Sequence, residues 1–140
     1  MKIDFSGQVA VVTGAGGGIG RAVSLALSDI GAKVLLVDLA QDAGLGTQAL
    51  IQRTGQEAVF VKADVSDPEQ VQHYVNTAMQ TWGRIDVFMN NAAWQGEIHS
   101  LIDYPVDVFD KVMNINVRGV FLGMKYVLPI MLAQGRGAVV

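Results

Sequence analysis

The sequence contains no cysteine. Disulfide bonds, thiolate zinc sites and thiol nucleophiles are therefore excluded within these 140 residues. A chain without cysteine suits a reducing compartment, and we expect a cytoplasmic protein. Charged residues are also scarce, at 16% with a formal net charge of −3. This balance argues against nucleic acid or an anionic membrane surface as the main partner.

Long apolar segments are lacking as well. The opening MKIDFSG has no apolar core of the kind found in signal peptides. The longest apolar run, residues 119–133, contains Lys125 and Pro129. It is shorter than the roughly 20 residues that a bilayer-spanning helix needs. We therefore expect no membrane span, and the 51% of hydrophobic residues indicates one packed domain over residues 1–140.

Metal-ligand spacings such as H-E-x-x-H do not occur in the sequence. His73 falls on the polar side of an expected helix, and His99 has no visible partner carboxylate or second histidine. We expect no metal site.

What the sequence does contain is a strand, a glycine turn and a helix in succession. Val9 to Val12 form a short apolar strand, and glycines crowd the turn that follows. From Ile19 onward, apolar residues recur with helical spacing. They are Ile19, Ala22, Val23, Ala26, Leu27 and Ile30. Such a turn lets the backbone approach a diphosphate closely, and the amides of the helix N-terminus stabilise its charge.

The turn favours a dinucleotide over phosphoryl transfer. A P-loop requires Lys followed by Ser or Thr after its last glycine, whereas Arg21 and Ala22 follow here. Asp38 comes about 20 residues after the turn, at the end of the second expected strand. A carboxylate there binds the adenosine ribose and repels a 2′-phosphate, which selects NAD. The alternative is that Asp38 merely caps the next helix.

Further strands and helices alternate along the chain and predict an α/β fold with a doubly wound parallel sheet. Strands are expected at 33–39, 58–63 and 85–89, and a fifth begins at 138. A weaker helix, interrupted by Gly44 and Gly46, is expected at 41–53. Further helices are expected from about 67 to 82 and at 106–133, the latter as one helix running into a longer one near 114–116. The helix near residue 67 starts either with Asp67 as N-cap and Pro68 behind it, or with a capping box.

Several of these segments together resemble the NAD-dependent branch of the short-chain dehydrogenase/reductase family. The resemblance rests on TGAGGGIG at 13–20, Asp38, Asp64-Val65, NNAA at 90–93 and Asn116. It implies a Rossmann-type sheet with strand order 3-2-1-4-5, cut within the fifth strand. The 140 residues would then be the N-terminal portion of a dinucleotide-binding domain.

The resemblance also implies roles for individual residues. Asp38 would bind the adenosine ribose, Asp64 the adenine amino group, and Val65 would line the adenine ring. The residues expected to bind the cofactor are Gly14, Gly17, Gly18, Ile19, Gly20, Asp38, Asp64, Val65, Asn90, Asn91 and Ala92. Ala93 departs from the family's usual glycine, which costs about 1 kcal/mol only if that position needs a positive φ.

Asn116 lies in an apolar helical stripe with Phe109, Val112, Met113, Val117, Val120 and Phe121. From the residues alone, it is a structural asparagine bonded to backbone. The resemblance implies instead a catalytic role, with a distorted backbone that helps to hold a proton-relaying water. The helix 106–133 is apolar on more than one face, and the resemblance implies a homo-oligomer, a dimer or tetramer, through it.

The family's serine and its Tyr-x-x-x-Lys pair follow the fifth strand, and no Tyr-x-x-x-Lys occurs here. We therefore expect the intact protein to move a hydride between NAD and a secondary alcohol or ketone, and the 140 residues alone to be inactive. Two alternatives stay open: a dinucleotide-binding module without turnover, and a non-catalytic partner of a full-length relative. Trp94, Gln95 or Glu97 either borders the substrate pocket or belongs to an ordinary surface loop.

Overall fold

The apolar strand after the N-terminus forms the middle of a parallel sheet in the computed structural model, which describes residues 3–140. The order is β3-β2-β1-β4-β5, and every neighbouring pair is parallel. The predicted fold class and strand order are confirmed. The strands are β1 (Val9–Thr13), β2 (Lys33–Asp38), β3 (Ala58–Lys62), β4 (Val87–Met89) and β5 (Ala138–Val139).

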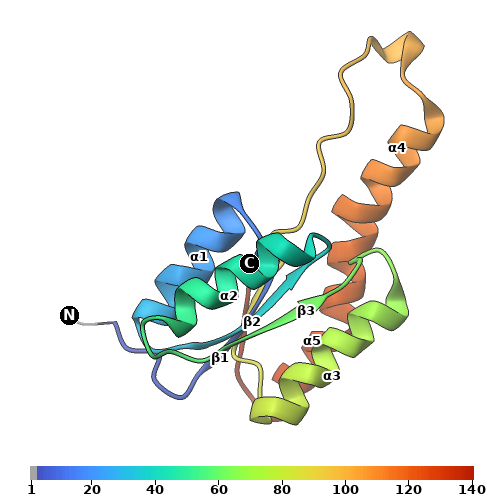
Figure 1. Ribbon diagram of the computed structural model, residues 1–140. Coiled ribbons are helices and arrows are strands. Elements are labelled where there is room, and N and C mark those ends of the chain that lie inside the picture. Colours follow the sequence, from blue (N-terminus) through green and yellow to red (C-terminus); the bar gives the residue numbers. More distant parts are fainter. Residues whose placement is uncertain (1–2) are drawn as a thin grey trace.

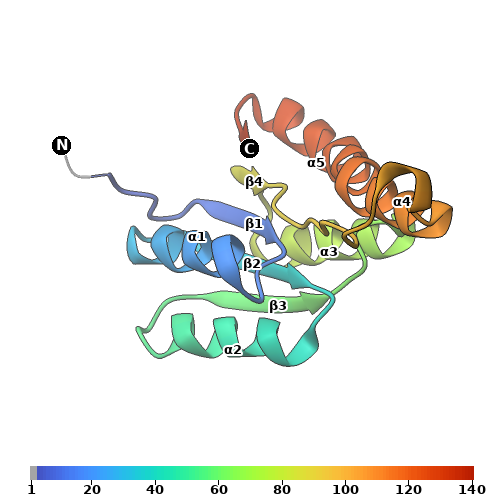
Figure 2. The same ribbon diagram turned by 90° about the horizontal axis from the view of Figure 1, so that it is seen from above.

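Helices cover both faces of this sheet, and each face has its own apolar core (Figures 1 and 2). The helices are α1 (Gly18–Asp29), α2 (Gln41–Gln52), α3 (Pro68–Trp82), α4 (Val106–Met113) and α5 (Gly119–Gln134). Val12, Val34 and Leu36 pack on the side of α1 and α2. Val11, Leu35 and Val37 pack on the side of α3 and α5. Neighbouring residues of one strand thus enter different cores, as the pleat requires.

The buried face of α1 differs from the predicted one. Gly20, Ser24 and Ser28 are buried, whereas Ile19 is 69% exposed. The physical reason is a close approach between the helix and the glycine turn, because a Cβ on Gly20 would lie 2.0 Å from the carbonyl oxygen of Gly14. A side chain at Gly20 would not fit, so the most buried positions of α1 are small residues, and of the predicted apolar stripe Leu27 packs against the core while Ile19 does not.

α2 is continuous, and its two glycines do not interrupt it. Gly44 faces the ring of Phe60, where a Cβ would lie 2.0 Å from Cε2. Gly46 has room, since the nearest atom to its Cβ would be Nη2 of Arg21 at 3.7 Å. One glycine is thus required by packing and the other is not.

α3 begins as the first of the two alternatives predicted. Asp67 is the N-cap, its carboxylate accepts the amides of Glu69 and Gln70, and Pro68 follows it. The side-chain amide of Gln70, more than these backbone amides, lowers the pKa of Asp67. The helix buries Tyr74 together with Val71, Val75 and Ala78, and burial raises the pKa of the Tyr74 hydroxyl.

Residues 106–134 form one continuous helix with an irregular turn inside it. A π-helical turn, Asn114–Arg118, joins α4 to α5, so the distortion expected around Asn116 is confirmed. The helix buries Leu122, Val127 and Met131, not the stripe predicted around Phe109 and Phe121, which is largely exposed. In Figure 1, α4 and the loop before it project beyond the sheet.

The helix is longer than the apolar run at 119–133, which was predicted from the sequence to be too short to span a bilayer. Residues 106–134 make a helix of 29 residues, which is long and apolar enough to cross a bilayer by length and composition. This is weak evidence for a span, because helices of protein cores pass the same test. Here one face of α5 packs against α3 and the sheet through Leu122 and Val127.

The nearly buried carboxylate of Asp86 forms hydrogen bonds and ion pairs at the starts of β1, β4 and β5. Asp86 accepts the amide of Val9 at 2.9 Å and a bidentate pair of bonds from Arg84 at 2.6 and 2.7 Å. Arg136, which precedes β5, adds a contact at 3.3 Å. The bond to Asp86 raises the pKa of the Arg84 guanidinium. A buried charge of this kind is tolerated because it is fully paired.

The two glycines of α2 generate a paired prediction. Gly44→Ala should destabilise the protein by about 1–3 kcal/mol, because the added methyl overpacks against Phe60. Gly46→Ala should stabilise it by up to about 1 kcal/mol, because alanine is the better helix former and its methyl would meet only Nη2 of Arg21, at an ordinary contact distance. Denaturant unfolding of both variants measures this. Equal effects of the two changes would contradict the packing described for Phe60.

Candidate functional site

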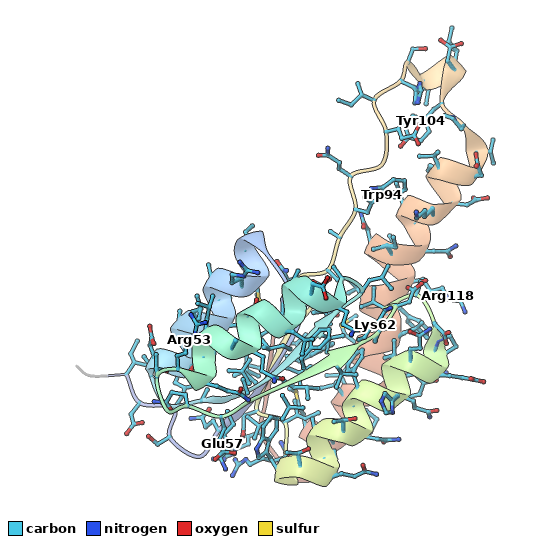
Figure 3. The ribbon with its side chains drawn as sticks, viewed as in Figure 1. Arg53, Glu57, Lys62, Trp94, Tyr104 and Arg118 are labelled. Atoms are coloured by element: carbon cyan, nitrogen blue, oxygen red, sulfur yellow. The ribbon has the colours of Figure 1, made fainter. Side chains whose placement is uncertain are left out.

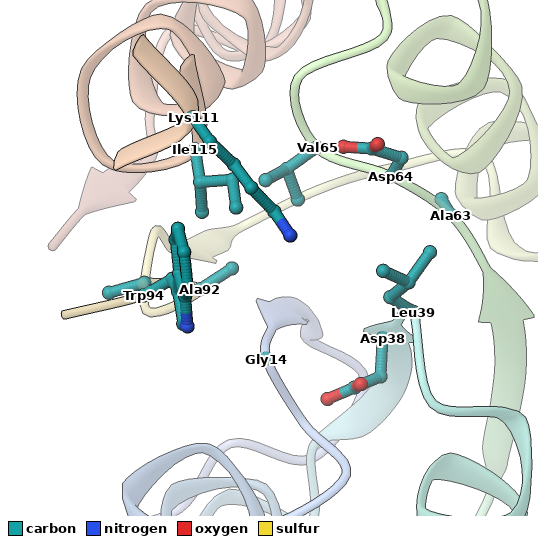
Figure 4. A pocket seen from close by; sticks show the side chains of 11 residues that line it. Gly14, Asp38, Leu39, Ala63, Asp64, Val65, Ala92, Trp94, Lys111 and Ile115 are labelled. Carbon is teal, nitrogen blue, oxygen red and sulfur yellow. The ribbon is translucent and has the colours of Figure 1, made fainter. Parts of the chain in front are cut away.

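A pocket of about 270 Å³ opens at the carboxyl ends of the strands, where α/β sheets bind ligands (Figure 4). It brings together residues from all three regions that the sequence singled out: the glycine turn, the ends of β2 and β3, and the segment after β4. The lining residues are Gly14, Asp38, Leu39, Ala63, Asp64, Val65, Ala92, Ala93, Trp94, Lys111 and Ile115.

Five of the predicted cofactor residues line this pocket, namely Gly14, Asp38, Asp64, Val65 and Ala92. Gly17, Gly18, Ile19 and Gly20 do not line it but form the start of α1 directly after Gly14. Asn90, Asn91 and Asn116 lie outside the lining. The roles assigned to these twelve residues in binding or catalysis stay predictions.

The start of α1 has the features of an anion site. Its N-cap is Gly17, which offers no side chain, and its first turn contains no acidic residue. The first amides of the helix are therefore free for a ligand. A Cβ on Gly17 or Gly18 would meet nothing within 4 Å, so this backbone faces open space. Gly14 and Gly18 have φ values of +66° and +49°, which favour glycine.

Asp38 occupies a fixed position at the pocket wall. Its Oδ2 accepts the amide of Gly16 at 2.8 Å, and its Oδ1 accepts the amide of Ala40 at 2.8 Å. The residue thus braces the glycine turn and the approach to α2, although α2 has no side-chain N-cap. Asp38 is therefore not the N-cap of α2, which is Ala40, and its role in binding the adenosine ribose stays a prediction.

Asp64 and Val65 form the wall opposite the glycine turn (Figure 4). Oδ1 of Asp64 accepts the amide and the hydroxyl of Ser66 at 2.9 and 2.7 Å, which fixes the carboxylate after β3. Val65 packs on Gly119, where a Cβ would lie 2.8 Å from Cγ2 of Val65. The long helix therefore closes this side of the pocket.

The segment after β4 is held against the glycine turn by Thr13, which opens the TGAGGGIG motif but was assigned no role from the sequence. Thr13 is 2% exposed, and its hydroxyl oxygen accepts the amides of Asn91 and Ala92, both at 3.0 Å. The side-chain amide of Asn91 donates to the carbonyls of Thr13 and Gly14 at 3.0 and 3.3 Å. Asn91 is thus bonded to the neighbouring glycine turn.

Asn90 and Ala93 belong to the same segment after β4. Ala93 does not have a positive φ, so the departure from glycine causes no strain of that kind. Nδ2 of Asn90 is buried and has no hydrogen-bond partner in the described part of the chain. Buried polar groups without a partner are uncommon, and Oγ of Ser28 and the Tyr74 hydroxyl, both away from the pocket, share this property.

The carboxamide of Asn116 pairs with the backbone of Trp94 in both directions. Oδ1 accepts the Trp94 amide at 2.8 Å, and Nδ2 donates to the Trp94 carbonyl at 2.9 Å. This is the backbone-bonded asparagine that the residues alone indicated. It fixes the loop after β4 to the π-helical turn, and Trp94 and Tyr104 lie between that loop and α4 (Figure 3).

Lys111 is a second residue that the sequence did not single out. Its Nζ lies 4.5 Å from the centre of the Trp94 ring, and it is the cation among the residues that line the pocket. Trp94 therefore borders the pocket, whereas Gln95 and Glu97 do not.

His99 has a partner after all, because its Nε2 lies 2.9 Å from Oε2 of Glu97. Within residues 3–140, no group of three or more His, Cys, Asp or Glu side chains could hold a metal ion.

Comparison with known proteins identifies the family. The family model described as short chain dehydrogenase matches residues 8–140. The chain belongs to the short-chain dehydrogenase family. It is 42% identical over 138 residues to levodione reductase from Leifsonia aquatica, a match that covers 97% of this chain and 52% of that protein.

Solved structures of this family agree with the fold. A crystal structure of levodione reductase superposes with a TM-score of 0.94 at 42% identity, over 96% of this chain and 53% of the other. NAD⁺-bound xylitol dehydrogenase gives 0.94 at 38% identity, over 96% and 52%. A short-chain dehydrogenase/reductase from Burkholderia phymatum in complex with NAD gives 0.93 at 34% identity, over 97% and 48%. The chain spans about half the length of the relatives it matches.

Proposed function

We propose that the protein containing this chain is an NAD-dependent oxidoreductase that acts on a secondary alcohol or ketone. The observation that carries the proposal is that Gly14, Asp38 and Asp64-Val65 line one pocket, and that the turn from Gly14 leads into the free N-terminal amides of α1. The chain belongs to the short-chain dehydrogenase family. The bound nicotinamide would supply the hydride chemistry, and the chain would supply placement and electrostatics.

The residues present fit a dinucleotide. Gly17 and Gly18 leave open space for a diphosphate at the helix N-terminus, and Asp38 presents a carboxylate at the end of β2. Asp38 favours NAD, because it would accept bonds from ribose hydroxyls and repel a 2′-phosphate. Two of the similar structures contain NAD, which supports the same preference.

Binding of nucleotides to the 140-residue chain tests the cofactor. We expect calorimetry to show tighter binding of NAD than of NADP. Gly17→Ala should weaken NAD binding by about tenfold or more, because its methyl would occupy the space over the turn. Gly17 has an extended φ of −164°, so alanine fits the backbone and thermal unfolding should be unchanged. Preferential binding of NADP, or full NAD affinity in the folded variant, would contradict the proposal.

We further propose that the groups which move the substrate proton lie outside these 140 residues, since the described chain offers no Tyr-x-x-x-Lys. The intact protein should reduce NAD when secondary alcohols are added, followed by the near-ultraviolet absorbance of NADH. The isolated 140-residue chain should not, even where it binds NAD. Reduction of NAD by the purified 140-residue chain would overturn this assignment.

The exposed face of the long helix supports a proposal of homo-oligomer formation. Seven large apolar side chains with helical spacing are exposed along one stripe. They are Val106, Phe109, Met113, Val117, Phe121, Leu128 and Leu132. A second copy of the protein, packed helix against helix, would remove this surface from water.

Sedimentation velocity of the intact protein tests this interface. The protein should sediment as a dimer or tetramer, and Phe121→Asp should shift it toward monomer by burying a charge in the interface. Leu45→Asp is the matched control, because Leu45 is an exposed apolar residue on α2, outside the stripe. A monomeric intact protein, or equal effects of the two substitutions, would exclude the proposed interface.

A further inference from the structure

Two polar side chains behind the glycine turn contact it without lining the pocket. Thr47 on α2 is fully buried, and Arg21 on α1 is partly buried. They also contact each other, since Nε of Arg21 donates to Oγ1 of Thr47 at 2.9 Å.

The other hydrogen bonds of Thr47 and Arg21 go to two carbonyls of the glycine turn and to the carbonyl of Ala43 on α2. The Thr47 hydroxyl has a single proton, and its nearer acceptor is the carbonyl of Ala15 at 2.9 Å, ahead of that of Ala43 at 3.3 Å. Nη2 of Arg21 donates to the carbonyl of Gly16 at 2.5 Å and to that of Ala43 at 3.2 Å. Two successive carbonyls of the turn are thus bound from behind.

Binding a carbonyl also sets the direction of the next amide. The described chain contains no cis peptide bond, and the C=O and N–H of a trans peptide point in opposite directions. With the Ala15 carbonyl on Thr47, the Gly16 amide points the other way, to Oδ2 of Asp38 at 2.8 Å. With the Gly16 carbonyl on Arg21, the Gly17 amide points away from Arg21.

We propose that Thr47 and Arg21 are positioning residues for the dinucleotide. Thr47 acts through the peptide between Ala15 and Gly16 and sets the position of Asp38. Arg21 acts through the next peptide and aims the Gly17 amide at the diphosphate. The inference rests on the proposed function, and it assigns to residues outside the pocket a share in both affinity and the choice between NAD and NADP.

The hydrogen bonds of Arg21 also affect the choice between NAD and NADP. Its guanidinium donates to one hydroxyl and two carbonyls, so its charge is held behind the turn. A 2′-phosphate beside Asp38 would need a cation that is free to turn toward it. While Thr47 holds Arg21, this cation is not available, and the carboxylate of Asp38 stays in place.

The test compares Thr47→Val with Thr47→Ser in the 140-residue chain. Valine keeps the branched shape and loses the hydroxyl, whereas serine keeps the hydroxyl. Calorimetry should show NAD binding weakened about tenfold in Thr47→Val and NADP binding weakened less, so that the preference for NAD falls. Thr47→Ser should keep both affinities within about twofold of the wild type.

A purely structural role would give a different result. Thr47→Val would then lower the melting temperature, while the NAD affinity and the NAD-to-NADP ratio of the folded protein stayed at wild-type values. That outcome would overturn the inference and leave the proposed function standing. A wild-type chain that binds neither nucleotide would overturn both.

Arg21→Lys supplies a second test should Thr47→Val fail to fold. Lysine keeps the positive charge but cannot reach Thr47, Gly16 and Ala43 at once. ADP, which carries the diphosphate, should bind several-fold more weakly to this variant, and adenosine should bind as it does to the wild type. Unchanged ADP binding would overturn the role given to Arg21.

Discussion

The close approach of Gly20 to the carbonyl of Gly14 is the constraint on which the site depends. A Cβ at Gly20 would lie 2.0 Å from that oxygen, so α1 can start directly at the end of β1 only because glycine stands there. This contact brings the free amides of the helix to the carboxyl edge of the sheet. The ends of β2, β3 and β4 meet at the same edge, because all the strands are parallel.

The turn is held from two sides before any ligand binds. Asn91 and Thr13 fasten it to the end of β4, and Thr47 and Arg21 hold its carbonyls on the side of α2. A turn with this many glycines would otherwise have considerable conformational freedom to lose on binding. Ordering it in the folded protein reduces that cost, which is the general advantage of preorganised sites.

The sequence predicted those features that depend on local patterns. The glycine turn, the helix start near Asp67 and the alternation of strands and helices are each set by residues close together in the chain, and the structure confirms them. Of the two caps left open for that helix, the structure shows Asp67. The most buried positions of α1 were not predicted, because apolar spacing identifies bulky residues, whereas Gly20, Ser24 and Ser28 are buried and the contact with Gly14 leaves no room for a Cβ at Gly20. The long helix buries a face other than its most regular apolar stripe for a related reason, since Gly119 and Gly123 pack closely on Val65 and Phe88.

The remaining parts of the site depend on contacts between distant residues. Thr47 and Ala15 are 32 residues apart, and Asn116 and Trp94 are 22 apart, so no local pattern marks either bond. The contact of Lys111 with Trp94 likewise exists only because the loop after β4 folds back along α4. Side chains that hold the turn and the loop are therefore the part of the site that needed a structure.

The most direct measurement is a backbone amide NMR spectrum of the chain recorded during addition of NAD. A dinucleotide site at this turn predicts that the amides of Gly17, Gly18, Ile19 and Gly20 shift together with those of Val65 and Ala92. Because helix N-terminal amides would exchange solvent for phosphate oxygens, the first group should move most. Shifts confined to other regions, or none at saturating NAD, would contradict a dinucleotide site at the start of α1.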